Sequence, residues 1–102
     1  MPVQLPRSII ETPRNLAPVT DAMAGIGFRL VASEAGTMDS GAARYSDGVT
    51  EVIVWKDRSR WFIGDERAVL EPMGFFRAFD DVAEFCDALA QFVTARHDAR
   101  LA

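Results

Sequence analysis

The most informative pattern of hydrophobic and polar positions lies in residues 49–55, which read Val-Thr-Glu-Val-Ile-Val-Trp. Alternate side chains of a β-strand point to opposite faces of the sheet, so Val52 and Val54 face one side. Ile53 and Trp55 face the other side. A strand that is apolar on both faces needs cover on both, either from the rest of the chain or from a partner.

Three other segments have strand-like sequences, and together with residues 49–55 they predict an antiparallel meander. Asp47-Gly48 is typical of a two-residue hairpin turn, because such a turn needs positive φ at its central positions. The predicted strands are 28–32, 42–46, 49–55 and 60–64, and the turn predicts the pairs Tyr45–Thr50, Arg44–Glu51, Ala43–Val52 and Ala42–Ile53.

Two helices are predicted, one before and one after these strands. The first begins at Leu16 or Pro18 and ends at Ala24, with Gly25 as the left-handed residue that terminates it. The second begins at Asp80 or Asp81 and is long, because the apolar positions that follow recur at helical spacing. Its apolar stripe consists of Val82, Phe85, Cys86, Leu89, Phe92 and Val93.

The predicted fold class is α+β, with an antiparallel meander of four to five strands. Residues 68–71 are an additional strand in this prediction, and residues 75–79 are either another short strand or the lead-in to the last helix. Both helices pack on one face of the sheet. Prolines in residues 1–15 predict an extended N-terminal arm, and residues 16–102 form a single α+β domain.

Composition narrows the class of protein. The chain has 102 residues, of which 49% are hydrophobic and 25% charged, as in ordinary globular domains. A net charge of −4 disfavours binding to nucleic acid or to anionic membranes, both of which need surplus basic side chains. With a single cysteine, no signal peptide and no apolar run of about 18 residues, the chain is expected to be cytoplasmic.

Candidate catalytic and metal-ligating residues are few. Asp80, Glu84 and Asp87 lie close together near the start of the last helix, where acidic side chains favour the helix dipole. No oxygen-rich loop accompanies them, so we expect an acidic surface and no metal site. Cys86 falls on the apolar stripe and His97 lies beyond it, so neither predicts a catalytic group. The chain is therefore expected to have no cofactor and no enzymatic activity.

Aromatic and basic residues around the 56–60 turn predict a protein-binding surface, since Trp, Tyr and Arg are enriched in protein interfaces. The acidic helix face is a secondary candidate. Three covers for the second sheet face remain open: a homodimer, another protein, or residues 1–15 and 65–79. The residues of the predicted surface are Trp55, Arg58, Arg60, Trp61 and Tyr45.

The order of short helix, antiparallel meander and long acidic helix resembles the small immunity proteins that neutralise bacterial polymorphic toxins. The residues that carry the resemblance are Ala24 to Phe28, Tyr45 to Gly48, Trp61 to Ile63, and Phe79 to Val82. It implies a stoichiometric inhibitor that binds a protein and has no chemistry of its own. The alternative is a small-ligand-binding protein or small enzyme, with a pocket between the sheet and the last helix, lined by Tyr45 and Cys86.

Overall fold

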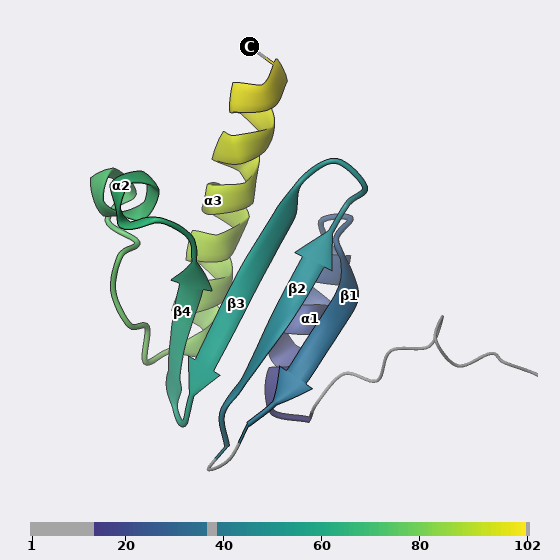
Figure 1. The fold of residues 1–102 in the computed structure, drawn as a ribbon, viewed down its shortest axis with the longest axis vertical. Coiled ribbons are helices and arrows are strands. Elements are labelled where there is room, and N and C mark those ends of the chain that lie inside the picture. The colour runs from purple at the N-terminus through teal and green to yellow at the C-terminus, as the bar shows by residue number, and fades with distance from the viewer. Residues whose placement is uncertain (1–13, 37–38, 102) are drawn as a thin grey trace, which may run out of the picture.

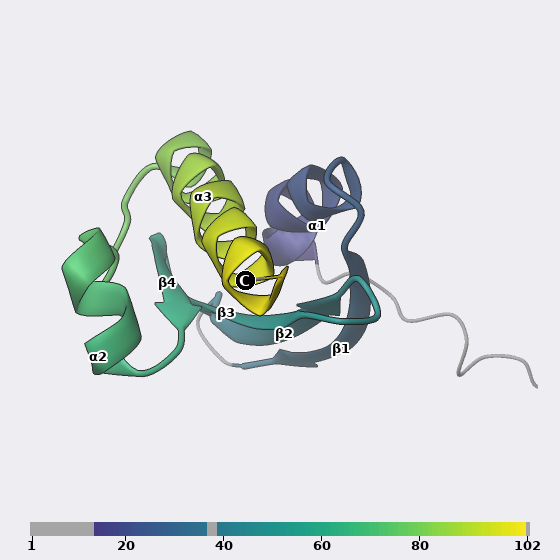
Figure 2. The same ribbon diagram turned by 90° about the horizontal axis from the view of Figure 1, so that it is seen from above.

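The computed structural model describes residues 14–36 and 39–101, and these residues form one four-stranded antiparallel sheet with helices on one of its faces (Figures 1 and 2). Residues 1–13 of the predicted arm lie outside the described residues. The elements are a 3-10 helix Arg14–Leu16, α1 Ala17–Ala24, β1 Arg29–Ala35, β2 Gly41–Ser46, β3 Glu51–Asp57, β4 Arg60–Gly64, α2 Arg67–Leu70, a 3-10 helix Glu71–Met73, and α3 Val82–Leu101.

The strands follow one another in the order β1-β2-β3-β4, so each pairs with its neighbour in the chain. Figure 2 shows α1 and α3 side by side on one face of this sheet, while α2 lies beyond the β4 edge. This arrangement confirms the predicted α+β class and the meander with a short N-terminal and a long C-terminal helix. None of the described helices is long and apolar enough to cross a membrane.

The predicted register between β2 and β3 is wrong by two residues. Tyr45 pairs with Val52 and Ser46 with Glu51, so a four-residue loop replaces the predicted two-residue turn. The predicted partner of Arg44, Glu51, is its diagonal neighbour, and the two side chains still approach to 3.8 Å. Because the shift is an even number of residues, every side chain keeps its predicted face.

The longer loop is stabilised by its own side chains. The carboxylate Oδ1 of Asp47 accepts hydrogen bonds from the backbone N–H groups of Val49 and Thr50 at 2.9 and 2.7 Å. Ser46 Oγ accepts another from the N–H of Gly48, which has a φ of 98°. An aspartate that bonds the backbone two and three residues ahead competes with a tight turn, and here it prevails.

The first helix ends at Ala24, as predicted, but the left-handed residue that follows it is Gly27 and not Gly25. Gly25 has a φ of −65°, whereas Gly27 has a φ of 89° and is the left-handed residue. The N–H of Gly27 donates to the carbonyl of Ala24 at 3.1 Å, and the N–H of Phe28 donates to that of Met23 at 2.9 Å. These two bonds form a Schellman motif, and the buried side chains of Met23 and Phe28 accompany it.

Residues 68–71 do not form the predicted strand. They belong to α2 and the 3-10 helix that follows it, where Arg67 and Glu71 form an ion pair of 3.0 Å across one turn. Leu70 is buried and Val69 is exposed. A single helical turn gives this alternation of buried and exposed neighbours just as a strand does. Of residues 75–79, Phe79 alone pairs with the sheet, through two hydrogen bonds of 2.8 Å to the backbone of Trp61.

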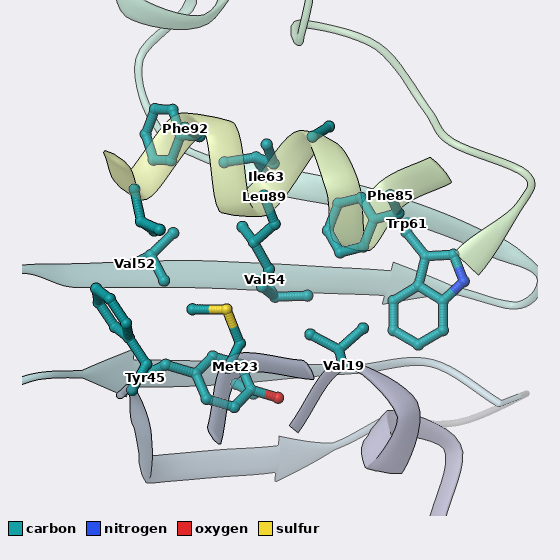
Figure 3. Close-up of a cluster of buried hydrophobic side chains, with 14 of the residues drawn as sticks. Val19, Met23, Tyr45, Val52, Val54, Trp61, Ile63, Phe85, Leu89 and Phe92 are labelled. Carbon is teal, nitrogen blue, oxygen red and sulfur yellow. The ribbon is translucent and has the colours of Figure 1, made fainter. Parts of the chain in front are cut away.

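The hydrophobic core fills the space between the sheet and the two helices (Figure 3). Val52 and Val54 of β3 point into it, and Phe85 of α3 stacks on Trp61 with ring centroids 5.6 Å apart. Asp81 caps α3, since its carboxylate accepts a hydrogen bond from the N–H of Ala83 at 3.2 Å. The labelled core residues in Figure 3 are Val19, Met23, Tyr45, Val52, Val54, Trp61, Ile63, Phe85, Leu89 and Phe92.

Candidate functional site

The face of the sheet that α1 and α3 leave uncovered is turned toward the viewer in Figure 1. Along β3 the side chains alternate, with Val52 and Val54 buried, Ile53 partly buried and Trp55 exposed. The strand pairing places Ala42 and Phe62 on either side of Trp55. We call this surface the open face, and define it by Ala32, Glu34, Ala42, Arg44, Glu51, Ile53, Trp55, Phe62 and Gly64.

Trp55 is the most prominent side chain of the open face, with 53% of its surface exposed. Its indole lies against Gly64 of β4: a Cβ atom at position 64 would lie 2.7 Å from Trp55 Cδ1 and 3.0 Å from Ile53 Cγ2. Glycine is the residue that permits so close an approach of a ring to the backbone. Glycine at position 64 therefore leaves the space that the indole of Trp55 occupies on the surface of the sheet.

Two shallow hollows lie beside Trp55. One, of about 420 Å³, extends over β1, β2 and β3, and its lining includes Ala32, Arg44 and Ile53. The other, of about 270 Å³, extends toward Gly36 and Gly41. Both are bordered by Glu34, Ala42 and Trp55. Ala42 is the small residue between Glu34 and Trp55, and together these three residues border a shallow groove.

Two residues of the predicted partner surface lie in the core. Tyr45 is fully buried, and its hydroxyl is 2.8 Å from the hydroxyl of Thr20 on α1. Trp61 is 5% exposed and stacks on Phe85. The even-numbered residues of β3 and the odd-numbered residues of β4 share the covered face, which is why Trp55 and Trp61 point in opposite directions. The prediction for Tyr45 and Trp61 is corrected accordingly: neither is accessible to a partner.

The arginines of the β3–β4 turn remain at the surface. Arg60 lies 3.8 Å from the carboxylate of Asp80, so these two predicted contact residues pair with each other. Arg58 has a φ of 60°, the positive value that a primed hairpin turn takes at its first central position. With Asp57 and Ser59, the two arginines border a hollow of about 280 Å³ at the end of the sheet.

A buried lysine behind this turn was not among the predicted site residues. Lys56 is 9% exposed, and its ammonium donates to the backbone carbonyl of Arg58 and to the carbonyl and carboxylate of Asp39 at 3.2 and 2.8 Å. It also lies over the ring of Trp61, 5.3 Å from the centroid. The alternation of β3 carried the signal, because position 56 shares the buried face of Val52 and Val54.

Lys56 connects two loops at one end of the sheet. Asp39 has a φ of 62° and Arg58 a φ of 60°, and the same ammonium binds both residues. The hydrogen bond from Lys56 lowers the pKa of the Asp39 carboxyl below its usual value of 3.8. Left-handed backbone at a residue other than glycine is unfavourable, so surrounding contacts must hold it in place. Lys56 supplies such contacts on both sides.

The predicted acidic helix face is partly neutralised. Asp80 pairs with Arg60, and Glu84 accepts a hydrogen bond from Arg77 at 3.2 Å; Asp87 is exposed. Among the described residues no group of three His, Cys, Asp or Glu side chains is placed to hold a metal ion. These carboxylates surround the start of α3, where the helix dipole favours them.

The predicted interior pocket would use Tyr45 and Cys86, and both side chains pack against the core. Burial raises the pKa of the Tyr45 hydroxyl and also that of the Cys86 thiol, which keeps the thiol in its unreactive protonated form. The aromatic rings of Phe85 and Phe92 fill the space between sheet and helix. The side chain of His97 lies outside the described part of the chain.

No protein-family model matches this chain, and neither do any curated proteins or solved structures.

Proposed function

We propose that this protein is a non-enzymatic protein-binding module whose contact surface is the open face, with Trp55 as the main contact residue. The observation that carries the proposal is the half-exposed indole that lies against Gly64, on the sheet face that neither α1 nor α3 covers. Tryptophan is the residue most enriched among those that dominate binding energy in interfaces. Small neighbours and charged residues around it provide the groove and the polar rim of such an interface.

The size of the open face bears on the kind of partner. The four strands are five to seven residues long and about 4.8 Å apart, so the face of the sheet has an area of roughly 400 Å². A stable complex buries about 800 Å² on each partner. Stacking the open faces of two copies would therefore supply too little area. A different protein that also reaches the β3–β4 turn at Arg58 and Arg60 fits better.

Stoichiometric inhibition, as in the immunity proteins that the sequence resembles, is the function we propose for this binding. The net charge of −4 suits a basic protein target. Of the two candidate reactive side chains, Tyr45 is buried and Cys86 is partly buried, and burial raises the pKa of both groups. An inhibitor needs only a surface, which the open face provides.

Affinity capture from the native host tests the proposal. The wild-type chain is expected to retain a specific protein, and Trp55→Ala is expected to weaken its binding by about 2 kcal/mol or more, roughly thirtyfold in Kd. Purified chain should then reduce the activity of the captured protein at a one-to-one ratio. Titration calorimetry measures the affinity, and an activity assay of the partner measures inhibition.

Phe76→Ala is the matched control, because Phe76 is 49% exposed and lies outside the open face. It should leave the affinity unchanged. Retention of the partner by Trp55→Ala, or equal losses in the two variants, would contradict the proposal. Sedimentation of the purified chain as a dimer that Trp55→Ala dissociates would instead assign the open face to a homodimer.

A further inference from the structure

The strand register places four side chains of the open face in one row across the sheet. Glu34 of β1 pairs with Ala42 of β2, Ala42 with Trp55 of β3, and Trp55 with Phe62 of β4. Directly opposed residues have Cβ atoms about 5 Å apart, so the carboxylate of Glu34 and the indole of Trp55 stand about 10 Å apart at their bases. Only the methyl group of Ala42 lies between them.

This gap is the place where the two hollows meet, since Glu34, Ala42 and Trp55 border both. An aromatic ring therefore borders one side of the groove and a carboxylate the other, with the methyl group of Ala42 between them. Such a site matches a long side chain that has an aliphatic stem and a planar cationic end. A guanidinium stacks on the indole and pairs with the carboxylate at the same time.

The charges of the open face agree with a cationic occupant. Arg44 pairs with Glu51 at 3.8 Å, and Arg60 pairs with Asp80 at the same distance. Within residues 14–36 and 39–101, no ion pair engages Glu34. The side chain of Glu34 is exposed, and Arg44 and Arg60 pair with carboxylates other than Glu34.

We propose that the groove between Glu34 and Trp55 binds an arginine side chain of the protein partner. The inference rests on the proposed function, because it assigns the chemistry of the partner group that contacts Trp55. The aliphatic stem of the arginine covers Ala42. Its guanidinium lies against the indole and donates hydrogen bonds to the carboxylate of Glu34, which is its counterion.

The test is an NMR titration of the whole chain with Nα-acetyl-arginine methylamide. One ion pair and one ring contact predict a Kd between about 1 and 100 mM, within reach of such a titration. The indole N–H resonance of Trp55 is expected to shift in a saturable way. Trp61, the second of the two tryptophans, is buried and provides an internal reference that should stay unchanged.

Two controls separate a specific site from general charge effects. The citrulline analogue of the probe has the same shape without the charge and should leave the Trp55 resonance in place. Glu34→Gln should weaken binding of the arginine probe by about threefold or more, as loss of an exposed ion pair implies. Asp21→Asn, which removes the same charge from the exposed surface of α1, should leave it unchanged.

An unmoved Trp55 resonance, an equal response to citrulline, or full binding by Glu34→Gln would each overturn the inference. Its failure is distinct from failure of the proposed function. If Trp55→Ala loses the captured partner while the arginine probe does not bind, the partner uses another group on the same face. If the probe binds and Trp55→Ala retains the partner, the groove exists but the partner contacts a different surface.

Discussion

The two tryptophans of this chain lie on adjacent strands and have opposite surroundings. Trp61 is 5% exposed, stacks on Phe85 and carries the ammonium of Lys56 over its ring. Trp55 is 53% exposed and rests on a glycine. The sheet thus uses one indole to complete the core and presents the other on its surface.

The difference between them comes from what lies on each side of the sheet. On the covered face, α1 and α3 supply apolar groups that exclude water from Trp61 (Figure 3). On the open face, Trp55 lies between Ala42 and Phe62 in the strand pairing and over Gly64, and no helix among the described residues packs on it, so the indole stays half-exposed. The buried core therefore lies on one face of the sheet, and the proposed contact surface lies on the other.

Of the substitutions that test this comparison, Trp61→Ala is expected to have the largest effect on stability. Removing a buried indole should lower the free energy of unfolding by about 3–5 kcal/mol, because it leaves a cavity beside Phe85. Trp55→Ala should lower it by less than about 1 kcal/mol, as for most surface positions. Urea unfolding followed by far-ultraviolet circular dichroism measures both. Similar losses in the two variants would mean that Trp55 also belongs to the core.

A smaller loss is expected for Lys56→Met, which keeps the apolar stem over Trp61 but removes the ammonium. The carbonyl of Arg58 and the backbone of Asp39 then lose charge-assisted hydrogen bonds, and we expect a decrease of about 1.5–3 kcal/mol in unfolding free energy. Urea unfolding measures the decrease. A change near zero would show that the β3–β4 turn holds its conformation without Lys56.

The dependence of unfolding free energy on pH tests the ion pair between Lys56 and Asp39. Because the pKa of Asp39 is lowered in the folded state, its charged form favours folding at neutral pH. That contribution is complete above pH 3.8, the usual pKa of the group, and is lost as the pH falls through the lower pKa of the folded state. On acidification, the unfolding free energy of Asp39→Asn should therefore decrease by less than that of the wild-type chain. Lys56→Met should reduce the decrease by the same amount.

Much of the fold was predictable because hydrophobic periodicity reports which side of an element is buried. The alternation of Val52 to Trp55 assigned the two faces of β3 correctly, and the apolar stripe from Val82 to Val93 located the long helix. The register was not predictable in the same way. It depends on Asp47, whose side chain bonds the backbone of a longer loop instead of permitting a two-residue turn.

The candidate site was predicted only in part, since exposure depends on the neighbours that tertiary packing brings together. Trp61 belongs to a run of three apolar residues, Trp61 to Ile63, that gives no sign of which side α3 will cover. The support of Trp55 comes from Gly64, nine positions along the chain and on the next strand. Such a contact appears only once the register between β3 and β4 is known.

Gly64→Ala is expected to have a small effect on stability. On the open face it should change the position of the Trp55 ring. Its Cβ atom would lie 2.7 Å from Trp55 Cδ1 and 3.0 Å from Ile53 Cγ2, so the indole must move away and Ile53 must shift slightly. Alanine also suits a strand better than glycine, and the net change in unfolding free energy should stay within about 1 kcal/mol. The indole N–H resonance of Trp55 should move while that of Trp61 does not.

If a partner recognises the position of the Trp55 ring, Gly64→Ala should weaken binding almost as much as Trp55→Ala, and the double variant should bind no more weakly than Trp55→Ala alone. Full additivity would mean that Gly64 contacts the partner directly, and that the indole needs no fixed orientation.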